Sequence, residues 1–256
     1  MKIEDVNEIY NTYKKADVKK SINTDDSMYI SGKDWYFSTG RSGIDCILSG
    51  LLSTRLPHVH RIMDLPCGYG RVGRHLRAAF PSAEIFFCDI DRSAVDFCAT
   101  EFHGHKVYSE PDLTHVPLPT HLNVIWVGSL FTHLSRQKVA EWLGYLSTKL
   151  SSDGVIVATF HGYFTATNPP PFLRVNIDDL RRQFHETGYG FEAYKSDDYV
   201  RLEDYGVSVS KPSAILDIAA AIPSTRVVSY TERGWAANHD VLVLCKDDRL
   251  RPFGSK

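Results

Sequence analysis

The sequence has few cysteines, and none of them form the Cys-x-x-Cys spacing of a metal or redox site. The five cysteines are odd in number and scattered along the chain: Cys46, Cys67, Cys88, Cys98 and Cys245. Such a set is typical of reduced thiols in a cytoplasmic protein. It predicts neither a disulfide framework nor a metal site.

An excess of basic charge and long apolar runs are lacking as well. Lys and Arg number 29 against 31 Asp and Glu, so the net charge is -2, whereas a protein held to nucleic acid by bulk electrostatics normally has a basic excess. No apolar run approaches the roughly 18 residues of a membrane span, and the N-terminal MKIEDVNEIY has no apolar core of a signal peptide. We therefore expect no nucleic acid or membrane partner, and a cytoplasmic location.

The composition is that of a globular protein. The chain has 256 residues, 43% hydrophobic and 23% charged, enough for a core that needs no metal or disulfide. No repeat, low-complexity block or Gly/Ser-rich linker divides it. The simplest organisation is an N-terminal helical cap at 1–57 and one domain at 58–256, with an insertion at about 162–212.

Strand and helix patterns alternate from residue 59 onward. Short apolar runs lie at 60–65, 83–88, 106–108, 123–127 and 155–160, with helical patterns between them. Buried apolar strands separated by helices predict a parallel sheet covered on both faces. Two more strands, at 226–230 and 241–245, are joined by a connection too short for a helical crossover, so we expect them to pair antiparallel.

A glycine turn follows the first of these strands. Gly68, Gly70 and Gly73 form GxGxxG, a pattern that fits a dinucleotide site but is weak by itself. Asp64 separates the alternatives, because a carboxylate repels a pyrophosphate and attracts a cation. S-adenosylmethionine (SAM) has an ammonium, a sulfonium and no phosphate, and it suits this turn. Asp89, after the second strand, can accept ribose hydroxyls of either ligand.

Several segments, in this order, resemble the class I SAM-dependent methyltransferases. They are MDLPCGYGR, FFCDIDRSAVDF, NVIWVGSLFTHLS, LSSDGVIVATFHG and NHDVLVLCK. The resemblance covers roughly residues 58–161 and 213–246. It implies an α/β fold with a doubly wound, Rossmann-like, mostly parallel sheet of seven strands whose last strand is antiparallel. It also implies SAM as cofactor and S-adenosylhomocysteine as product.

The same resemblance implies a cofactor site. Its residues would be Asp64, Pro66, Gly68, Gly70, Asp89, Ile90, Gly128 and Ser129. Asp64 and the glycines would hold the cofactor, Asp89 the ribose and Ile90 the adenine, with Gly128 and Ser129 lining the site. Two residues depart from the family pattern. Pro66 replaces the first glycine and removes one N–H donor, and Asn123 replaces the acid before the fourth strand, which leaves a loss of catalysis open.

Two histidines are the candidate catalytic residues. His133 follows the fourth strand and His161 ends the fifth, where parallel sheets place their ligands. An imidazole there can accept a proton near neutral pH; the alternative is that both only satisfy local hydrogen bonds. His239 begins the last strand, and we expect it to be structural. Asn168-Pro-Pro-Pro-Phe172 is similar to the Asn-Pro-Pro-aromatic signature of amino-group methyltransferases, but it follows the wrong strand, so we interpret it as a loop.

An aromatic group lies in the insertion. It comprises Tyr163, Phe164, Phe172, Tyr189, Phe191, Tyr194, Tyr199 and Tyr205. These rings suit a cap over a saccharide or aromatic substrate, or equally a packing surface within the chain or in a homodimer. Arg71, Arg74 and Arg77 follow the glycine turn at helical spacing, and we expect a solvated face there.

We therefore expect an enzyme, a SAM-dependent methyltransferase acting on the oxygen or nitrogen of a small-molecule or saccharide acceptor. Two alternatives stay open. One is a non-catalytic protein that keeps the fold for binding partners, suggested by Pro66 and Asn123. The other is an NAD-dependent oxidoreductase, favoured only by the GxGxxG pattern.

Overall fold

The computed structural model describes residues 1–30, 34–169, 175–194 and 205–250. Seven strands form the main sheet: β1 (Arg61–Leu65), β2 (Glu84–Asp89), β3 (His105–Tyr108), β4 (Leu122–Val127), β5 (Leu150–Phe160), β8 (Thr225–Trp235) and β9 (His239–Lys246). The helices around it are α1 (Ile3–Lys15), α2 (Trp35–Leu51), α3 (Gly73–Ala79), α4 (Arg92–Glu101), α5 (Arg136–Ser147) and α8 (Pro212–Ala220). Single turns of 3-10 helix follow β3, β4 and β9: η1 (Leu113–His115), η2 (Phe131–His133) and η4 (Asp248–Leu250).

The strand order in the sheet is β3-β2-β1-β4-β5-β9-β8. The strands from β3 to β5 are parallel to one another, and β9 runs antiparallel to both β5 and β8. The predicted fold class, a mostly parallel seven-stranded sheet with an antiparallel last strand, is confirmed. Because the chain reverses its winding direction between β1 and β4, the carboxyl ends of these two strands are where such a sheet binds ligands.

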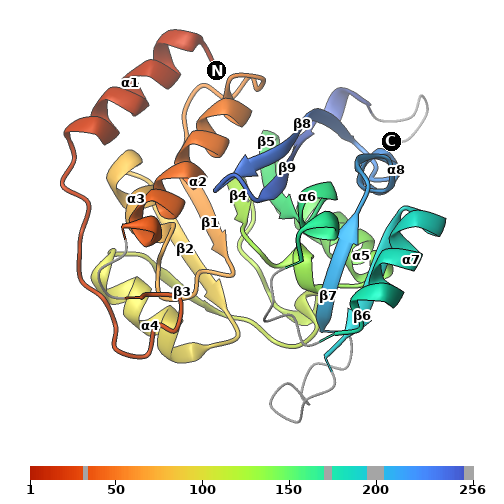
Figure 1. Ribbon diagram of the computed structural model, residues 1–256. Helices are drawn as coiled ribbons and strands as arrows, with labels where there is room; N and C mark the ends of the chain where they lie inside the picture. The colour runs from red at the N-terminus through yellow and green to blue at the C-terminus, as the bar shows by residue number, and fades with distance from the viewer. Residues whose placement is uncertain (31–33, 170–174, 195–204, 251–256) are drawn as a thin grey trace.

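Helices cover both faces of the sheet (Figure 1). Alternate strand residues point to opposite faces: Ile62 and Val124 pack into the core under α1 to α4, and Met63 and Ile125 into the core under α5 and α8. The central strands β1, β4 and β5 are mostly apolar because both of their faces are buried. Within the described residues no helix combines the length and apolar character that crossing a membrane requires.

Asn123 joins the starting ends of three strands. Its side-chain oxygen accepts hydrogen bonds from the backbone N–H groups of His60 and Arg61 at 2.8 and 3.0 Å, and its amide donates to Ser151 Oγ at 3.1 Å. These are the amino ends of the strands, and the glycine turn lies at the opposite, carboxyl ends. The replacement of an acid by Asn123 therefore affects how the amino ends of β1, β4 and β5 are aligned.

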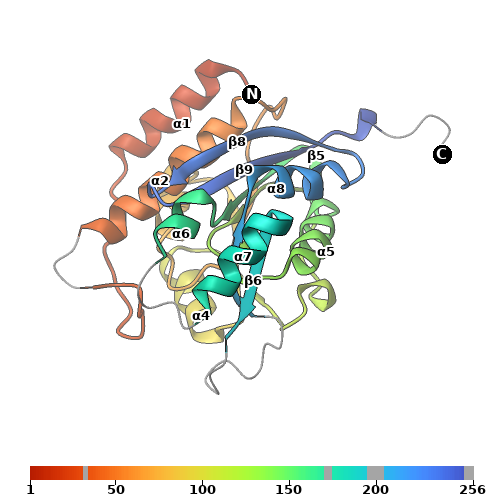
Figure 2. The ribbon, with the colours of Figure 1, turned by 45° about the vertical axis from the view of Figure 1, so that its right-hand side comes forward.

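A smaller unit lies between β5 and α8. It contains α6 (Tyr163–Thr167), α7 (Ile177–Thr187), β6 (Tyr189–Ala193) and β7 (Gly206–Ser210). The strands β6 and β7 form an antiparallel pair outside the main sheet, and Figure 2 shows α7 beside them. Leu180, Phe184, Val207 and Val209 form its own small core. The sequence analysis placed an insertion here, but it did not predict this pair of strands.

The helix α2 begins with an aromatic segment. It starts at Trp35, so Trp35–Phe37 form its first turn. Tyr36 is fully buried and donates a hydrogen bond to Asp26 at 2.6 Å. Tyr36 thus anchors the segment before α2 to the helix.

The expected solvated arginine face on α3 is wrong. Arg74 is 1% exposed. Its guanidinium donates to the carbonyl oxygens of Gly70 and Tyr69 in the glycine turn, at 2.9 and 3.1 Å, and to those of Lys19 and Ser21, at 3.1 and 2.8 Å. Arg74 therefore fastens the N-terminal segment to the turn.

We predict that Arg74→Met destabilises the protein by about 2–4 kcal/mol, because four carbonyl groups lose their charged donor. The free energy of unfolding, measured by urea denaturation, checks this. Arg55→Met removes the same charge from an exposed residue and should change the stability by less than about 0.5 kcal/mol. Equal stabilities of the two variants would contradict the role given to Arg74.

Candidate functional site

The glycine turn connects β1 to α3 and lies against the end of β2. The backbone N–H of Cys67 donates to the carbonyl oxygen of Cys88 at 2.9 Å, which joins the turn to β2. Pro66 begins the turn with a cis peptide bond and contributes no N–H. Gly68 and Gly70 both have positive φ, +46° and +77°, a conformation that favours glycine.

Glycines keep this turn open on one side and closely packed on the other. A Cβ added to Gly68 would meet no atom within 4 Å, so the backbone there is bare. A Cβ at Gly70 would lie 2.3 Å from the ring of Phe102, and one at Gly73 would lie 2.6 Å from the ring of Phe87. The turn therefore packs tightly against α4 and β2 while it leaves room for a ligand over Gly68.

Asp64 is a buried carboxylate without a partner. It is 1% exposed, and its Oδ2 atom forms no hydrogen bond. Burial raises the pKa of this carboxyl well above its usual value, the nearby Asp89 raises it further, and Arg71 opposes the rise. Native proteins rarely leave such a group unsatisfied. This orphaned oxygen beside the turn is therefore a site for a hydrogen-bond donor, and a cationic donor fits best.

Asp89 ends β2, next to the turn. Its two carboxylate oxygens accept hydrogen bonds from the backbone N–H groups of Gly68, at 2.8 Å, and Asp91, at 3.0 Å. Burial raises its pKa and these backbone hydrogen bonds lower it. A carboxylate has about four acceptor positions, so two remain for a ligand. Ile90, which follows, is 48% exposed and offers a bare apolar side chain.

Gly128 and Ser129 follow β4 and approach the same turn. The N–H of Gly128 donates to Leu65 O at 3.2 Å, and that of Ser129 donates to Thr159 Oγ1 at 2.8 Å. Ser129 has a φ of +59°. The structure thus brings the ends of β1, β2 and β4 together around the turn, with all eight residues predicted for the cofactor site at these strand ends.

His133 and His161 lie side by side, with ring centroids 6.4 Å apart. The Nδ1 atom of His133 is 2.7 Å from Gly206 O, and that of His161 is 3.2 Å from Ser208 O. Burial lowers the pKa of His133, and it lowers that of His161 to about 4, with His133 as a second cause. Both imidazoles are therefore uncharged at neutral pH.

His239 extends this pair to a row of three imidazoles. Its ring lies 4.8 Å from that of His161 and 5.0 Å from the indole of Trp235. Its Nδ1 atom is 3.4 Å from Thr159 Oγ1, the atom that also accepts from Ser129. Burial lowers its pKa well below the usual value. His239 thus connects the β4 exit to the two candidate catalytic histidines.

Arg71 is a residue whose role the sequence analysis missed. Its guanidinium lies over the ring of Trp235 at 5.3 Å, and it is close enough to Asp64 and His239 to lower the pKa of both. It forms no hydrogen bond or ion pair with any residue that the structure describes. Its position directly after Gly70 was the available signal; we assigned it to a solvated helix face instead.

Two predictions fall partly or wholly outside the described residues. Of Asn168–Phe172, only Asn168 and Pro169 are described, and the Asn168 amide donates to Phe164 O and Thr167 Oγ1. Phe172 and Tyr199 of the aromatic group also lie outside. Among the described rings, that of Tyr205 is stacked on His133 at 4.8 Å.

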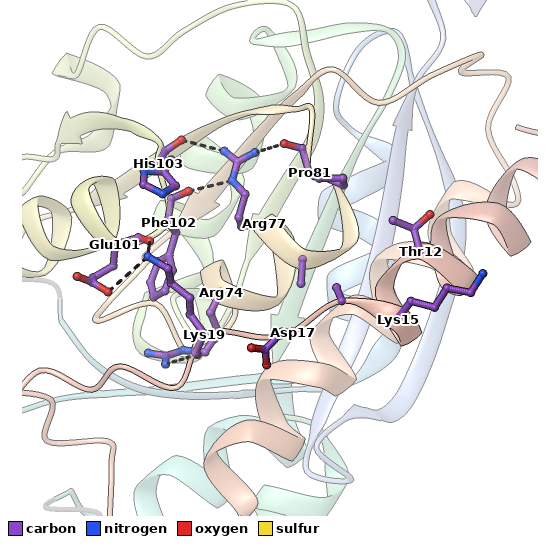
Figure 3. Close-up of a pocket in the computed structure, with 12 residues that line it drawn as sticks. Thr12, Lys15, Asp17, Lys19, Arg74, Arg77, Pro81, Glu101, Phe102 and His103 are labelled. Atoms are coloured by element: carbon purple, nitrogen blue, oxygen red, sulfur yellow. Dashed lines mark hydrogen bonds and ion pairs between the residues drawn. The ribbon is translucent and has the colours of Figure 1, made fainter.

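A cavity of about 560 Å³ lies away from these strand ends, between α1, α3 and the end of α4 (Figure 3). Its arginines and Lys19 have partners. Lys19 donates to Glu101 O at 2.7 Å. The guanidinium of Arg77 donates to the carbonyl oxygens of Phe80, Pro81, Ala83, Phe102 and His103. These charges already serve the fold, so the cavity is not the candidate site.

Comparisons with known proteins agree with this geometry. Residues 63–156 match the family model described as a methyltransferase domain. This segment includes the glycine turn, Asp89 and the exits of β4. A search of curated proteins gave no match.

Solved structures share the fold at low sequence identity. An S-adenosylmethionine-dependent methyltransferase from Clostridium acetobutylicum is 13% identical with a TM-score of 0.56, over 85% of this chain and 94% of that one. A TehB-like SAM-dependent methyltransferase from Corynebacterium glutamicum is 17% identical with a TM-score of 0.51, over 85% and 91%. The magnesium protoporphyrin IX methyltransferase of Synechocystis, solved with bound SAH, is 10% identical with a TM-score of 0.53, over 86% and 89%.

The methyltransferase domain, the strand order and the glycine turn confirm the predicted resemblance, and with it the prediction of an enzyme. A methyltransferase domain therefore occupies residues 63–156, and the chain shares its fold with solved S-adenosylmethionine-dependent methyltransferases.

Proposed function

We propose that this enzyme methylates an oxygen or nitrogen of a small-molecule or saccharide acceptor, with residues 58–256 as the catalytic domain. The cofactor would lie across the carboxyl ends of β1, β2 and β4. The acceptor would lie next to it, beside His133 and His161.

The buried carboxylate of Asp64 is the observation that carries the cofactor assignment. Its unpaired Oδ2 atom suits the ammonium group of SAM, and a pyrophosphate next to it would be repelled. The electrostatics thus favour SAM over NAD at a turn whose glycines fit either. Pairing with a cation would also remove the cost of burying this group.

With the ammonium group of SAM at Asp64, the roles of the other cofactor residues follow from their positions around the glycine turn. Asp89 would accept the ribose hydroxyls with the two acceptor positions that the backbone leaves unused. The exposed side chain of Ile90 would cover the adenine. Gly68 presents bare backbone between them, and Pro66, Gly70, Gly128 and Ser129 shape the walls.

Arg71 completes the set as the group that binds the cofactor's carboxylate. Its guanidinium has no protein acceptor among the described residues and lies over the ring of Trp235. Trp235 is itself held by a hydrogen bond from its indole N–H to Thr39 O at 3.0 Å. Asp64 and Arg71 thus offer opposite charges to the two ends of an α-amino acid.

When bound, SAM supplies a methyl group on a positively charged sulfur, which leaves as a neutral thioether. The protein need only align the acceptor, exclude water and take a proton. The acceptor oxygen or nitrogen forms the bond to the methyl carbon as the carbon–sulfur bond breaks, and its proton passes to Nε2 of His161 or His133 and then to water. Both imidazoles can take that proton because they are uncharged at neutral pH.

The cofactor assignment predicts that the protein binds S-adenosylhomocysteine and not NADH in calorimetry. Asp89→Asn should weaken S-adenosylhomocysteine binding by about tenfold or more, because it loses charge-assisted hydrogen bonds. A screen of acceptor extracts with methyl-labelled SAM should yield a labelled product. NADH binding without S-adenosylhomocysteine binding would refute the proposal, and binding without any methyl transfer would favour the non-catalytic alternative.

Asp64→Asn should stabilise the ligand-free protein while it weakens ligand binding. The raised pKa of Asp64 means that the unfolded chain releases this proton at a lower pH than the folded one, so wild-type stability falls as pH rises above the usual carboxyl range. The variant lacks this loss and should be more stable by about 1–3 kcal/mol at pH 7.5, with a smaller advantage at pH 4.5. Melting temperatures with and without S-adenosylhomocysteine test both effects. An Asp64→Asn protein that is less stable and still binds normally would contradict the assignment.

The proposed role of Arg71 predicts that its replacement weakens the binding only of ligands that have the amino-acid carboxylate. Arg71→Met should weaken S-adenosylhomocysteine binding by about tenfold or more, but it should leave the affinity for methylthioadenosine, which lacks the amino-acid end, unchanged. Calorimetry with both ligands measures the difference, with Arg55→Met as the control of equal charge. Equal losses for the two ligands would show that Arg71 acts on the shape of the site rather than on a carboxylate.

A further inference from the structure

Strand β7 fixes which nitrogen of His133 and of His161 carries the proton. Both Nδ1 atoms lie against backbone carbonyl oxygens of β7, those of Gly206 and Ser208. A carbonyl oxygen can only accept, so each Nδ1 must be the donor. An uncharged imidazole has one N–H, so the Nε2 atom of each ring has a free lone pair and no hydrogen.

The two carbonyls act together because they are two residues apart on one strand. Alternate residues of a strand direct their hydrogen-bonding groups to the same side, and β7 faces β6 with its other side. The N–H of Ser210, two residues further, donates to His161 O at 2.8 Å, and the hydroxyl of Ser208 donates to Phe131 O at 2.9 Å. One edge of β7 therefore docks along η2 and the end of β5 and sets both imidazoles.

Both Nε2 atoms are unpaired. Neither forms a hydrogen bond with the described part of the chain, and neither is among its buried polar atoms that lack a partner. His75 is the contrast, because its Nε2 atom is fully buried and unpaired. The described part of the chain therefore leaves the Nε2 lone pairs of His133 and His161 unused.

Two free lone pairs restrict what can bind there. An O–H or N–H group of a ligand gains a hydrogen bond from such a nitrogen, whereas a carboxylate or phosphate oxygen faces it with another lone pair and is repelled. A metal ion is the other class of partner for imidazoles. Among the residues that the structure describes, no three His, Cys, Asp or Glu side chains are arranged to hold one.

We propose that His133 and His161 select a neutral acceptor that presents two O–H or N–H donors, of which one is methylated and the other anchors the molecule. This inference rests on the proposed function and narrows it: the groups bound at the two histidines are hydroxyl or uncharged N–H groups, and not carboxylates or phosphates. The products are ethers or N-methyl amines rather than methyl esters. His133 and His161 are thus specificity residues as well as proton acceptors.

The protonation pattern can be measured without any acceptor. In the protein labelled with ¹⁵N-histidine and saturated with S-adenosylhomocysteine, His133 and His161 should show a protonated Nδ1 and an unprotonated Nε2 at pH 7. The variants His133→Gln and His161→Gln assign the signals. A protonated Nε2 on either residue would overturn the inference, whatever the enzyme methylates.

The products and the variants supply the second test. Methyl-labelled SAM is incubated with a fraction of neutral polyols and amines and with a fraction of carboxylic acids and phosphates, and labelled products are tested for stability to alkali. We expect alkali-stable products from the neutral fraction only; methyl esters would overturn the inference and leave the methyltransferase assignment intact. His161→Phe, which has no acceptor atom, should lower kcat/KM for the labelled acceptor about tenfold or more and leave S-adenosylhomocysteine affinity unchanged.

His161→Gln keeps a side-chain oxygen and should recover part of that loss. His58→Gln, at an exposed residue before β1, should behave as wild type. Equal activity of the Phe and Gln variants would contradict selection by an acceptor atom. Loss of S-adenosylhomocysteine binding in wild-type protein would instead refute the cofactor assignment, while the ¹⁵N pattern would still decide the protonation of the two histidines.

Discussion

The packing around the glycine turn depends on one buried carboxyl group, that of Asp64 at the end of β1. Asp64 lies between β2 and β4, opposite Phe87 and Trp126, in the apolar centre of the sheet. Gly73 allows α3 to approach it closely: a Cβ at residue 73 would be 3.1 Å from its Oδ2 atom. The fold bears the cost of a buried polar atom without a hydrogen bond there, which is explained if the missing partner is a ligand. The Oδ2 atom of Asp64 is thus both a destabilising feature of the ligand-free fold and the proposed contact with the ligand.

The surrounding contacts hold that site without filling it. Arg74, in the first turn of α3, donates hydrogen bonds from its guanidinium to carbonyl oxygens of the glycine turn and of the N-terminal segment. Arg71 has a partly buried guanidinium too, but it stacks on Trp235 and keeps its donors free. Two arginines three residues apart therefore differ in their contacts: Arg74 is bound to the fold, and Arg71 is the one proposed to bind a ligand. Arg71 lies in the turn before α3 and Arg74 lies within the helix, so different groups pack around each side chain.

Local sequence patterns were enough to predict most of the fold. The features that could not be predicted depend on contacts between residues that are far apart in the sequence. The strands from β1 to β5 and the cap of α5 at Ser135 follow from apolar runs and from a side chain that bonds within its own turn. Asp64 and Asp89 could be found because their spacing from the glycines is local. The burial of Arg74 could not, because its partners Lys19 and Ser21 are more than 50 residues away. Likewise, β6 and β7 are short strands of mixed polarity that become recognisable only when paired and docked on η2.

The docking of β7 explains how one strand can serve stability and chemistry together. An unpaired strand edge exposes N–H and C=O groups that must find partners. Here the edge that does not face β6 finds them in the backbone of His161 and in two imidazole rings. Satisfying the strand therefore orients the rings and places their protons on Nδ1. Any change that shifts β7 along this edge by one residue would direct its N–H and C=O groups towards β6, and both histidines would lose their acceptors at once.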